Sequence, residues 1–234
     1  MKVTPMIFNT EMVKALLDGR KTVTRRPVKV DYERGMNGPV VRGKNGEVSV
    51  LSFAPIAGLC PFGNVGDLIW VRETFCPDPD CDHDSWDDHE LSFFEWNNCG
   101  CSAAFLPDAL KTNEHCLFKA GGFPDLKWTP SIHMPRWASR LTLKVTEVRI
   151  ERVSEITDEQ AIKEGMMTVT EAERAAINAG IGWYEKPHIQ FKNLWERIYG
   201  DWYQDPYVWV IEFEVIHQNV DKVVSEMGEV CQSK

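Results

Sequence analysis

Two segments of the chain carry apolar residues at helical spacing and therefore predict amphipathic helices. The first helix can be capped by Asn9 or Thr10 and ends at Gly19, and the second ends at Gly200. The apolar positions are Met12, Val13, Leu16 and Leu17 in the first helix and Phe191, Leu194, Trp195 and Ile198 in the second.

A capping box predicts a third, shorter helix. Thr157 and Gln160 have the spacing at which the cap side chain and the side chain three residues later satisfy each other's backbone N–H groups. We expect the helix that Thr157 opens to run towards Glu164 and to stop at Gly165.

Strands are predicted where β-branched and aromatic residues cluster or alternate with polar ones. The two segments that flank Asn45-Gly46 predict a hairpin, because this dipeptide favours a tight turn. The predicted strand segments are 22–26, 40–42, 47–51, 68–71, 140–153 and 207–216.

The order of these elements is helix, several strands, short helices and a final strand. It predicts an α+β fold, a small and mostly antiparallel β-barrel with flanking short helices. Periodicity is poor at about 76–127, which we interpret as a Cys- and Asp-rich insertion into a single domain that spans 1–216. Past His217 the chain is polar, and 217–234 is expected to be a loose C-terminal tail.

The formal net charge of −9 argues at first against a nucleic-acid partner, because phosphate binding needs a positive surface. The distribution of the charge changes this interpretation. Eight acids and no Lys or Arg lie between Cys76 and Cys101, and without those eight the chain has 27 acids against 26 bases. A large non-specific nucleic-acid surface is not expected, but the basic cluster at 20–29 is compatible with a ligand-sized anionic partner.

Hydrophobic residues make up 43% of the chain, which is enough for a core. The longest apolar runs, such as Val208 to Ile211, are far too short to cross a bilayer, and Met1 to Asn9 has no secretory signal. We therefore expect a cytoplasmic protein with no membrane partner. In that compartment its seven cysteines should be reduced, bound to metal or buried.

The Cys-rich segment holds candidate zinc ligands. Thiolates suit tetrahedral Zn²⁺, and the best set of four is Cys76, Cys81, Cys99 and Cys101. Their C-x4-C and C-x-C spacings differ from a standard zinc knuckle, so an acidic loop with reduced thiols is the alternative. The segregated acidity also motivates a different role, in which the insertion contacts a basic protein partner.

Several separated segments of the chain carry a family signature. Ala15 to Arg25 has the sequence ALLDGRKTVTR, Gly66 to Ile69 reads GDLI, and Val208 to Phe213 reads VWVIEF. In this order they resemble the ASCH (activating-signal-cointegrator homology) domain, with its opening I-x-x-G-x-K-T-x-T-x-R, its G-D-x-I strand and its last strand. Outside the insertion the chain is also similar to prophage-encoded ASCH proteins, including the blocks Trp128 to Trp137 and Leu194 to Trp209.

The resemblance implies a PUA-like β-barrel with a cleft for RNA or a nucleoside, and it implies no required cofactor. Some small bacterial members of the family are amidohydrolases that remove the acetyl group of N4-acetylcytidine with a Lys, a Thr and a Glu. The matching positions of this chain are Lys21, Thr24 and Glu164. The last match follows from laying 157–166 on the family's helix without a gap.

Amide hydrolysis needs a nucleophile and groups that take up and return its proton. Thr24 would be the nucleophile and Lys21 its base, once burial and the neighbouring arginines favour the neutral amine. Glu164 would shuttle the proton or hold the substrate's amino group. Because a regular strand puts positions 21 and 24 on opposite faces, this chemistry requires Lys21 to lie in the loop after Gly19 or at a bulge.

Each of these residues also has an ordinary structural interpretation. Lys21 can belong to a solvated turn, Thr24 can face solvent, and Glu164 can be an exposed helix acid. Arg25 and Arg26 can bind a phosphate or carboxylate of the ligand, or simply flank an edge strand. The functional alternatives are a non-catalytic RNA-binding module and a phage accessory protein that acts through its acidic insertion. The oligomeric state stays open.

Overall fold

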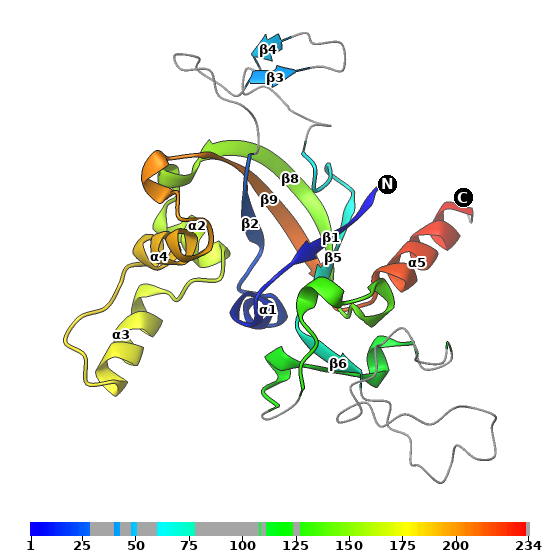
Figure 1. Cartoon of the computed structure of the whole chain (residues 1–234), viewed down its shortest axis with the longest axis horizontal. Helices are drawn as coiled ribbons and strands as arrows, with labels where there is room; N and C mark the ends of the chain where they lie inside the picture. The colour runs from blue at the N-terminus through cyan, green and yellow to red at the C-terminus, as the bar shows by residue number, and fades with distance from the viewer. Residues whose placement is uncertain are drawn as a thin grey trace. The chain divides into compact units, whose positions relative to one another are not determined.

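The computed structural model describes residues 1–28, 40–42, 48–50, 60–77, 108, 111–123 and 127–232, with the backbone alone at 40–42, 48–50 and 229–232. Within these residues the chain is an α+β protein with a five-stranded, mostly antiparallel sheet (Figure 1). The predicted α+β class and the predicted mostly antiparallel sheet are therefore confirmed. No helix in this part of the chain is long and apolar enough to span a membrane.

The strands and α-helices of the described residues have the following bounds. The strands are β1 (Val3–Ile7), β2 (Val23–Pro27), β3 (Val40–Arg42), β4 (Val48–Val50), β5 (Leu68–Arg72), β6 (Phe75–Pro77), β7 (Cys116–Phe118), β8 (Thr142–Arg152) and β9 (Tyr207–Ile216). The helices are α1 (Thr10–Leu17), α2 (Asp158–Lys163), α3 (Val169–Asn178), α4 (Pro187–Tyr199) and α5 (Val220–Gln232).

Five of the strands form the main sheet in the order β1-β5-β8-β9-β2. The first pair, β1 and β5, runs parallel, and the last pair, β9 and β2, runs antiparallel. The order has two ends, β1 and β2, within the described residues, so closure of the sheet into a barrel stays a prediction.

The chain divides into two compact units, each made of separate stretches of sequence. The first unit comprises Met1–Leu17, Leu68–Leu143 and Val215–Lys234, and the second comprises Asp18–Asp67 and Lys144–Glu214. Strands β8 and β9 run through both units. The side chains that the resemblance singles out as catalytic all belong to the second unit.

In the first unit, α5 occupies the segment that was predicted to be a loose tail. Val220 and Val223 of this helix are buried with Leu68 and Trp70 of β5 in one apolar cluster. Asn219, which precedes the helix, donates side-chain hydrogen bonds to three backbone carbonyl groups of the unit. The prediction of a loose tail is therefore wrong, because the helix has an apolar stripe, Val220, Val223 and Val224, that packs in this cluster.

The residues that flank the predicted insertion meet in the first unit, where Phe75 forms an isolated antiparallel bridge with Thr129. Strands β6 and β7 pair antiparallel, with Phe75 opposite Phe118. Both rings are buried in a small cluster with Met134 and Ala138. Residues 78–107, which hold most of the acids and cysteines of the segment, lie outside the described residues, so the interior of the insertion remains predicted from sequence alone.

The core of the second unit is built from the β2–β9 ladder and the helices α2 and α4 (Figure 1). In the ladder, Val23 lies opposite Glu212 and Pro27 opposite Val208. Helix α4 ends at Gly200, whose φ of 70° is a left-handed value that glycine tolerates best. The buried apolar residues of this core are Val23, Val153, Ile156, Ala161, Phe191, Trp195, Val208 and Val210.

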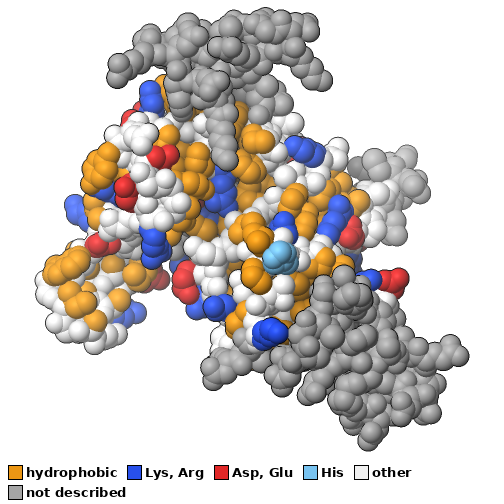
Figure 2. Space-filling model, in the orientation of Figure 1, with side chains coloured by type: hydrophobic (Ala, Val, Ile, Leu, Met, Phe, Trp, Pro, Cys, Tyr) orange, Lys and Arg blue, Asp and Glu red, His pale blue; other side chains and the backbone are white. Residues whose placement is uncertain are grey.

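Helix α3 adds little to this core and leaves apolar side chains at the surface. Thr168 and Glu171 form the capping box that opens it, and Ala172 is its one buried residue. Ile177 near the end of the helix and Trp183 in the loop that follows are 69% and 67% exposed. Figure 2 shows hydrophobic side chains gathered at the surface over this helix.

Most of the predicted elements are confirmed. The three predicted helices correspond to α1, α2 and α4, and the predicted strands to β2, β3, β4, β5, β8 and β9. Antiparallel pairing of β3 with β4 confirms the predicted hairpin, whose Asn45-Gly46 turn lies outside the described residues. Strands β1, β6 and β7 and helices α3 and α5 were not predicted.

Candidate functional site

Lys21 lies in the loop before β2, which is the position that the predicted chemistry requires. Gly19 leaves the preceding helix with a φ of 71°, and β2 begins two residues after Lys21. Two backbone hydrogen bonds fix the neighbouring Thr22: its N–H donates to the carbonyl of Lys163 at 2.9 Å, and its carbonyl accepts from the N–H of Phe213 at 3.0 Å. The loop is thus attached to the end of α2 and to β9.

The ammonium group of Lys21 is completely buried, and all three of its N–H donors have acceptors. Nζ lies 2.6 Å from Glu164 Oε2, 2.8 Å from the carbonyl oxygen of Glu164 and 2.8 Å from that of Val23. Lys21 is 0% exposed and Glu164 is 2% exposed. The interpretations of Lys21 as a solvated turn residue and of Glu164 as an exposed helix acid are therefore wrong.

Glu164 owes its position to the way α2 begins and ends. The Thr157 hydroxyl accepts a hydrogen bond from the Gln160 backbone, and the Gln160 side chain accepts one from the Thr157 backbone, which confirms the predicted capping box. Glu164 is the C-cap of the helix, and Gly165 follows it with a φ of 97°. The capping box and the glycine thus set the start and the end of a six-residue helix, and this helix places the Glu164 carboxylate next to Lys21.

Arg25 joins the buried pair from β2. Its Nη1 donates to Glu164 Oε1 at 3.3 Å and its Nη2 to Glu151 Oε2 at 2.9 Å. The guanidinium carbon lies 5.9 Å from the centre of the Phe191 ring. Both terminal nitrogens of this buried side chain therefore bind carboxylates of the protein itself, and its Nε has no hydrogen-bond partner among the described residues.

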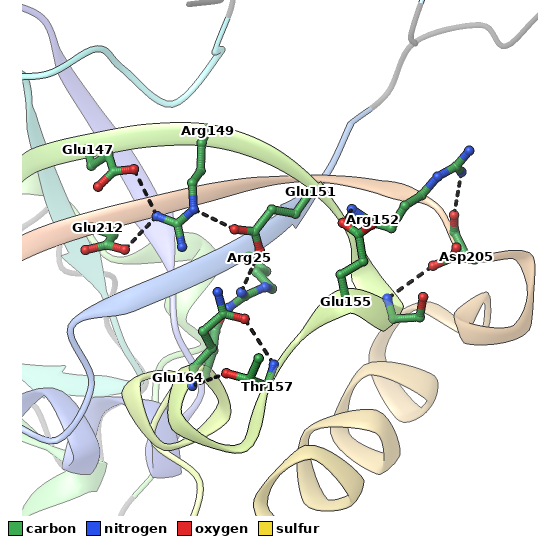
Figure 3. Close-up of polar contacts among 12 residues, drawn as sticks. Arg25, Glu147, Arg149, Glu151, Arg152, Glu155, Thr157, Glu164, Asp205 and Glu212 are labelled. Atoms are coloured by element: carbon green, nitrogen blue, oxygen red, sulfur yellow. Dashed lines mark hydrogen bonds and ion pairs between the residues drawn. The ribbon is translucent and has the colours of Figure 1, made fainter. Parts of the chain in front are cut away.

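A second arginine extends the charge network away from Lys21. Figure 3 shows Arg149 of β8 between Glu151 and Glu212. Its guanidinium lies 2.6 Å from each of these carboxylates and 3.3 Å from that of Glu147. Positive and negative side chains thus alternate in one continuous series: Lys21, Glu164, Arg25, Glu151, Arg149 and Glu212. Sequence reasoning missed this network, although Glu147, Arg149 and Glu151 are spaced by two in a predicted strand and therefore share one face.

Burial lowers the pKa of Lys21, because the interior does not solvate an ammonium ion as water does; the Glu164 carboxylate opposes this shift, and Arg26 and Arg25 reinforce it. Burial thus favours the neutral amine of Lys21, whose Nζ lies 2.6 Å from Glu164 Oε2. Such a pair can both accept and return a proton.

Thr24, the third candidate, is buried but is not connected to the other two. It lies opposite Ile211 in the ladder and is 1% exposed, so the solvent-facing interpretation is wrong. Side chains alternate along a strand, which turns Thr24 away from the face that carries Arg25. Among the described residues, no hydrogen bond joins its hydroxyl to Lys21 or Glu164. The structure thus brings together two of the three predicted catalytic residues.

Arg26 is half-buried, and its Nη1 lies 3.4 Å from the Tyr199 hydroxyl at the end of α4. Arg25 and Arg26 lie within β2, which is the last strand of the sheet order among the described residues, and so they belong to an edge strand. Their contact with a ligand stays a prediction.

The predicted zinc ligands fall almost entirely outside the described residues. Cys81, Cys99 and Cys101 lie there, whereas Cys76 is buried in β6 with its Sγ 3.5 Å from the carbonyl oxygen of Pro77. Within the described part of the chain, no three His, Cys, Asp or Glu side chains are grouped as metal ligands. The zinc site stays a prediction.

Comparison with protein-family models, with curated protein sequences and with solved structures finds no match to this chain. The ASCH resemblance therefore rests on the motifs alone, and the function has to be argued from the geometry of the buried cluster.

Proposed function

We propose that this chain is a cytoplasmic ASCH-type protein with a PUA-like fold that binds a nucleoside or RNA and removes the acyl group of an N4-acylated cytidine such as N4-acetylcytidine. One observation carries the proposal. The resemblance matches Lys21 and Glu164 to catalytic residues in two separate motifs, and their side chains meet at 2.6 Å in a buried site.

In the proposed reaction the pair handles the proton. The neutral amine of Lys21 takes the proton of the Thr24 hydroxyl as the oxygen attacks the acyl carbonyl carbon. The bond from that carbon to N4 breaks, and N4 receives the proton, which leaves cytidine and an acyl ester on Thr24. Water, deprotonated by the same pair, then cleaves the ester to the free acid and restores the hydroxyl.

Entry of substrate has to separate groups that are now in contact. Lys21, Thr24 and Glu164 are each at most 2% exposed, so a ligand must displace the segment that carries Glu164 or the loop that carries Lys21. Helix α2 is short, with six residues, and its C-cap is the residue that would move. In the proposed reaction, displacement releases Lys21 from Glu164 and brings its amine to the Thr24 hydroxyl, to which no hydrogen bond joins it among the described residues.

The test is the formation of cytidine from N4-acetylcytidine, followed by chromatography. Lys21→Met should abolish product while the protein stays folded by circular dichroism. Lys163→Met is the matched control, because Lys163 is an exposed lysine of α2, the helix that ends at Glu164, and it should leave turnover unchanged. Equal product from Lys21→Met and the unmodified protein would refute the assignment of the base.

A non-catalytic binding module is the second candidate, and the isolation of the Thr24 hydroxyl from Lys21 favours it. This function predicts affinity without turnover. Titration of a fluorescent single-stranded RNA should then show binding that falls with added salt, because phosphate contacts release counterions. Binding of RNA without any release of cytidine by the folded protein would establish this candidate over the enzyme.

A further inference from the structure

Glu151 is the second carboxylate that binds Arg25, in addition to Glu164 of the buried Lys21–Glu164 pair. The Arg25 guanidinium divides its two terminal nitrogens between Glu164, at 3.3 Å, and Glu151, at the shorter distance of 2.9 Å. The third nitrogen, Nε, has no hydrogen-bond partner in the described part of the chain. The orientation of this buried side chain therefore depends on two carboxylates and on the Phe191 ring.

Glu151 is itself held from the other side. Its Oε1 accepts from Arg149 Nε at 2.6 Å, while its Oε2 accepts from Arg25. Arg149 is anchored in turn by Glu212 of β9 at 2.6 Å. Three strands, β2, β8 and β9, thus contribute to one chain of alternating charges, and Glu151 is the link between its exposed and its buried part (Figure 3).

We propose that Glu151 is a positioning residue of this site: it holds the Arg25 guanidinium in the orientation in which it meets Glu164 beside Lys21. Glu151 touches neither Lys21 nor Glu164 in any contact that the structure shows. It acts through Arg25, both by fixing where that side chain points and by balancing its positive charge.

The charges around Lys21 determine in which direction loss of the Glu151 carboxylate shifts the pKa of Lys21. Lys21 is faced by Glu164 from the end of α2 and by Arg25 and Arg26 from β2. Without the Glu151 carboxylate, the charge of Arg25 is balanced by Glu164 alone. The surroundings of Lys21 then become more positive, which favours its neutral amine and makes it titrate at lower pH.

The experiment follows the titration of Lys21 by NMR, with ¹³C at lysine Cε and the Lys21→Met variant to assign the signal. Glu151→Gln keeps the shape of the side chain and removes its charge, and the Lys21 signal should then titrate at lower pH than in the unmodified protein. Glu151→Asp keeps the charge on a shorter side chain and should lie between the two. Glu214→Gln removes an exposed carboxylate from β9 and should change nothing.

The inference rests on the proposed function only where turnover is concerned. On N4-acetylcytidine, Glu151→Gln should lower kcat at least about tenfold with little change in KM, because it misplaces groups that act after binding. Equal titration of Lys21 in Glu151→Gln and the unmodified protein, or an equal shift in Glu214→Gln, would overturn the role of Glu151. If the unmodified protein shows no turnover, the proposed function fails, and the NMR titration still decides about Glu151.

Discussion

Lys21 and Glu164, 143 positions apart in the sequence, meet with 2.6 Å between Nζ and Oε2 in a site that water does not reach. The lysine comes from the loop that Gly19 opens, and the glutamate from the C-cap of α2. Both elements place an ionisable group at the same buried point. Charges are costly to bury, so removal of either partner leaves the other without its closest counter-charge.

Removal of the lysine should cost stability. Lys21→Met leaves the Glu164 carboxylate buried with Arg25 as its one remaining charged partner, and loss of one member of a buried ion pair typically costs about 3–5 kcal/mol. The measurement is the free energy of unfolding in urea. The control Lys163→Met, on an exposed lysine, should change it by less than about 0.5 kcal/mol.

The effects of substituting Lys21 and Glu164 on the free energy of unfolding should also be coupled. In a double-mutant cycle, Lys21→Met combined with Glu164→Met should cost less than the sum of the two single changes, by about 1–3 kcal/mol. The reason is that the second substitution removes the charge that the first leaves unpaired. Strict additivity would mean that the two side chains do not interact in solution.

Stability should depend on pH through Lys21. Because burial lowers the pKa of Lys21 in the folded state, the unfolded chain binds a proton there that the folded chain does not, in the range between that lowered pKa and 10.5. The free energy of unfolding should therefore rise with pH across this range for the unmodified protein relative to Lys21→Met. Urea unfolding of both proteins between pH 7 and 10 gives the comparison, and a constant difference would contradict the lowered pKa.

Loss of the N-cap of α2, the helix that ends at Glu164, should lower the stability of the protein. Thr157→Ala removes the hydroxyl that accepts from the Gln160 backbone, and loss of such a cap costs about 1 kcal/mol. Thr170→Ala is the matched control, because Thr170 is exposed in the first turn of α3 and caps nothing. The midpoint of urea unfolding should fall for the first variant and stay within error for the second.

The burial of α5 predicts the effect of a small deletion of side-chain volume. Val220 is 0% exposed, so Val220→Ala should lower the free energy of unfolding by about 2 kcal/mol. Val169→Ala makes the same chemical change at a valine that is exposed on α3 and should cost far less. Equal effects of the two substitutions would mean that α5 does not pack on β5.

Local signals in the sequence predicted the elements that carry the site. The capping box of Thr157 and the glycine at 165 define α2, and the strand predicted at 207–216 matches β9 residue for residue. Strand β1 was not predicted; it contains Pro5, a residue that sheets tolerate in edge strands, and β1 is at one end of the strand order among the described residues. Helix α3 was missed although Thr168 and Glu171 have capping-box spacing.

The long-range part of the site could not be derived from periodicity. That Lys21 and Glu164 form a pair was implied by the family resemblance and not by any pattern in the residues themselves. The roles of Glu151 and Arg149 depend on which strands are neighbours, and one sequence does not contain the strand order. The buried state of Arg25 likewise depends on helices α2 and α4, which pack on β2 from far along the chain.

The most direct test of the reactive pair is a single-turnover reaction, with protein in excess over N4-acetylcytidine and cytidine measured after rapid quenching. The unmodified protein should release cytidine in the first turnover, Glu164→Gln should not, and Glu159→Gln, on an exposed acid of the same helix, should behave as the unmodified protein. Folded protein that releases no cytidine, or a Glu164→Gln variant as fast as the unmodified protein, would contradict a catalytic role for Lys21 and Glu164.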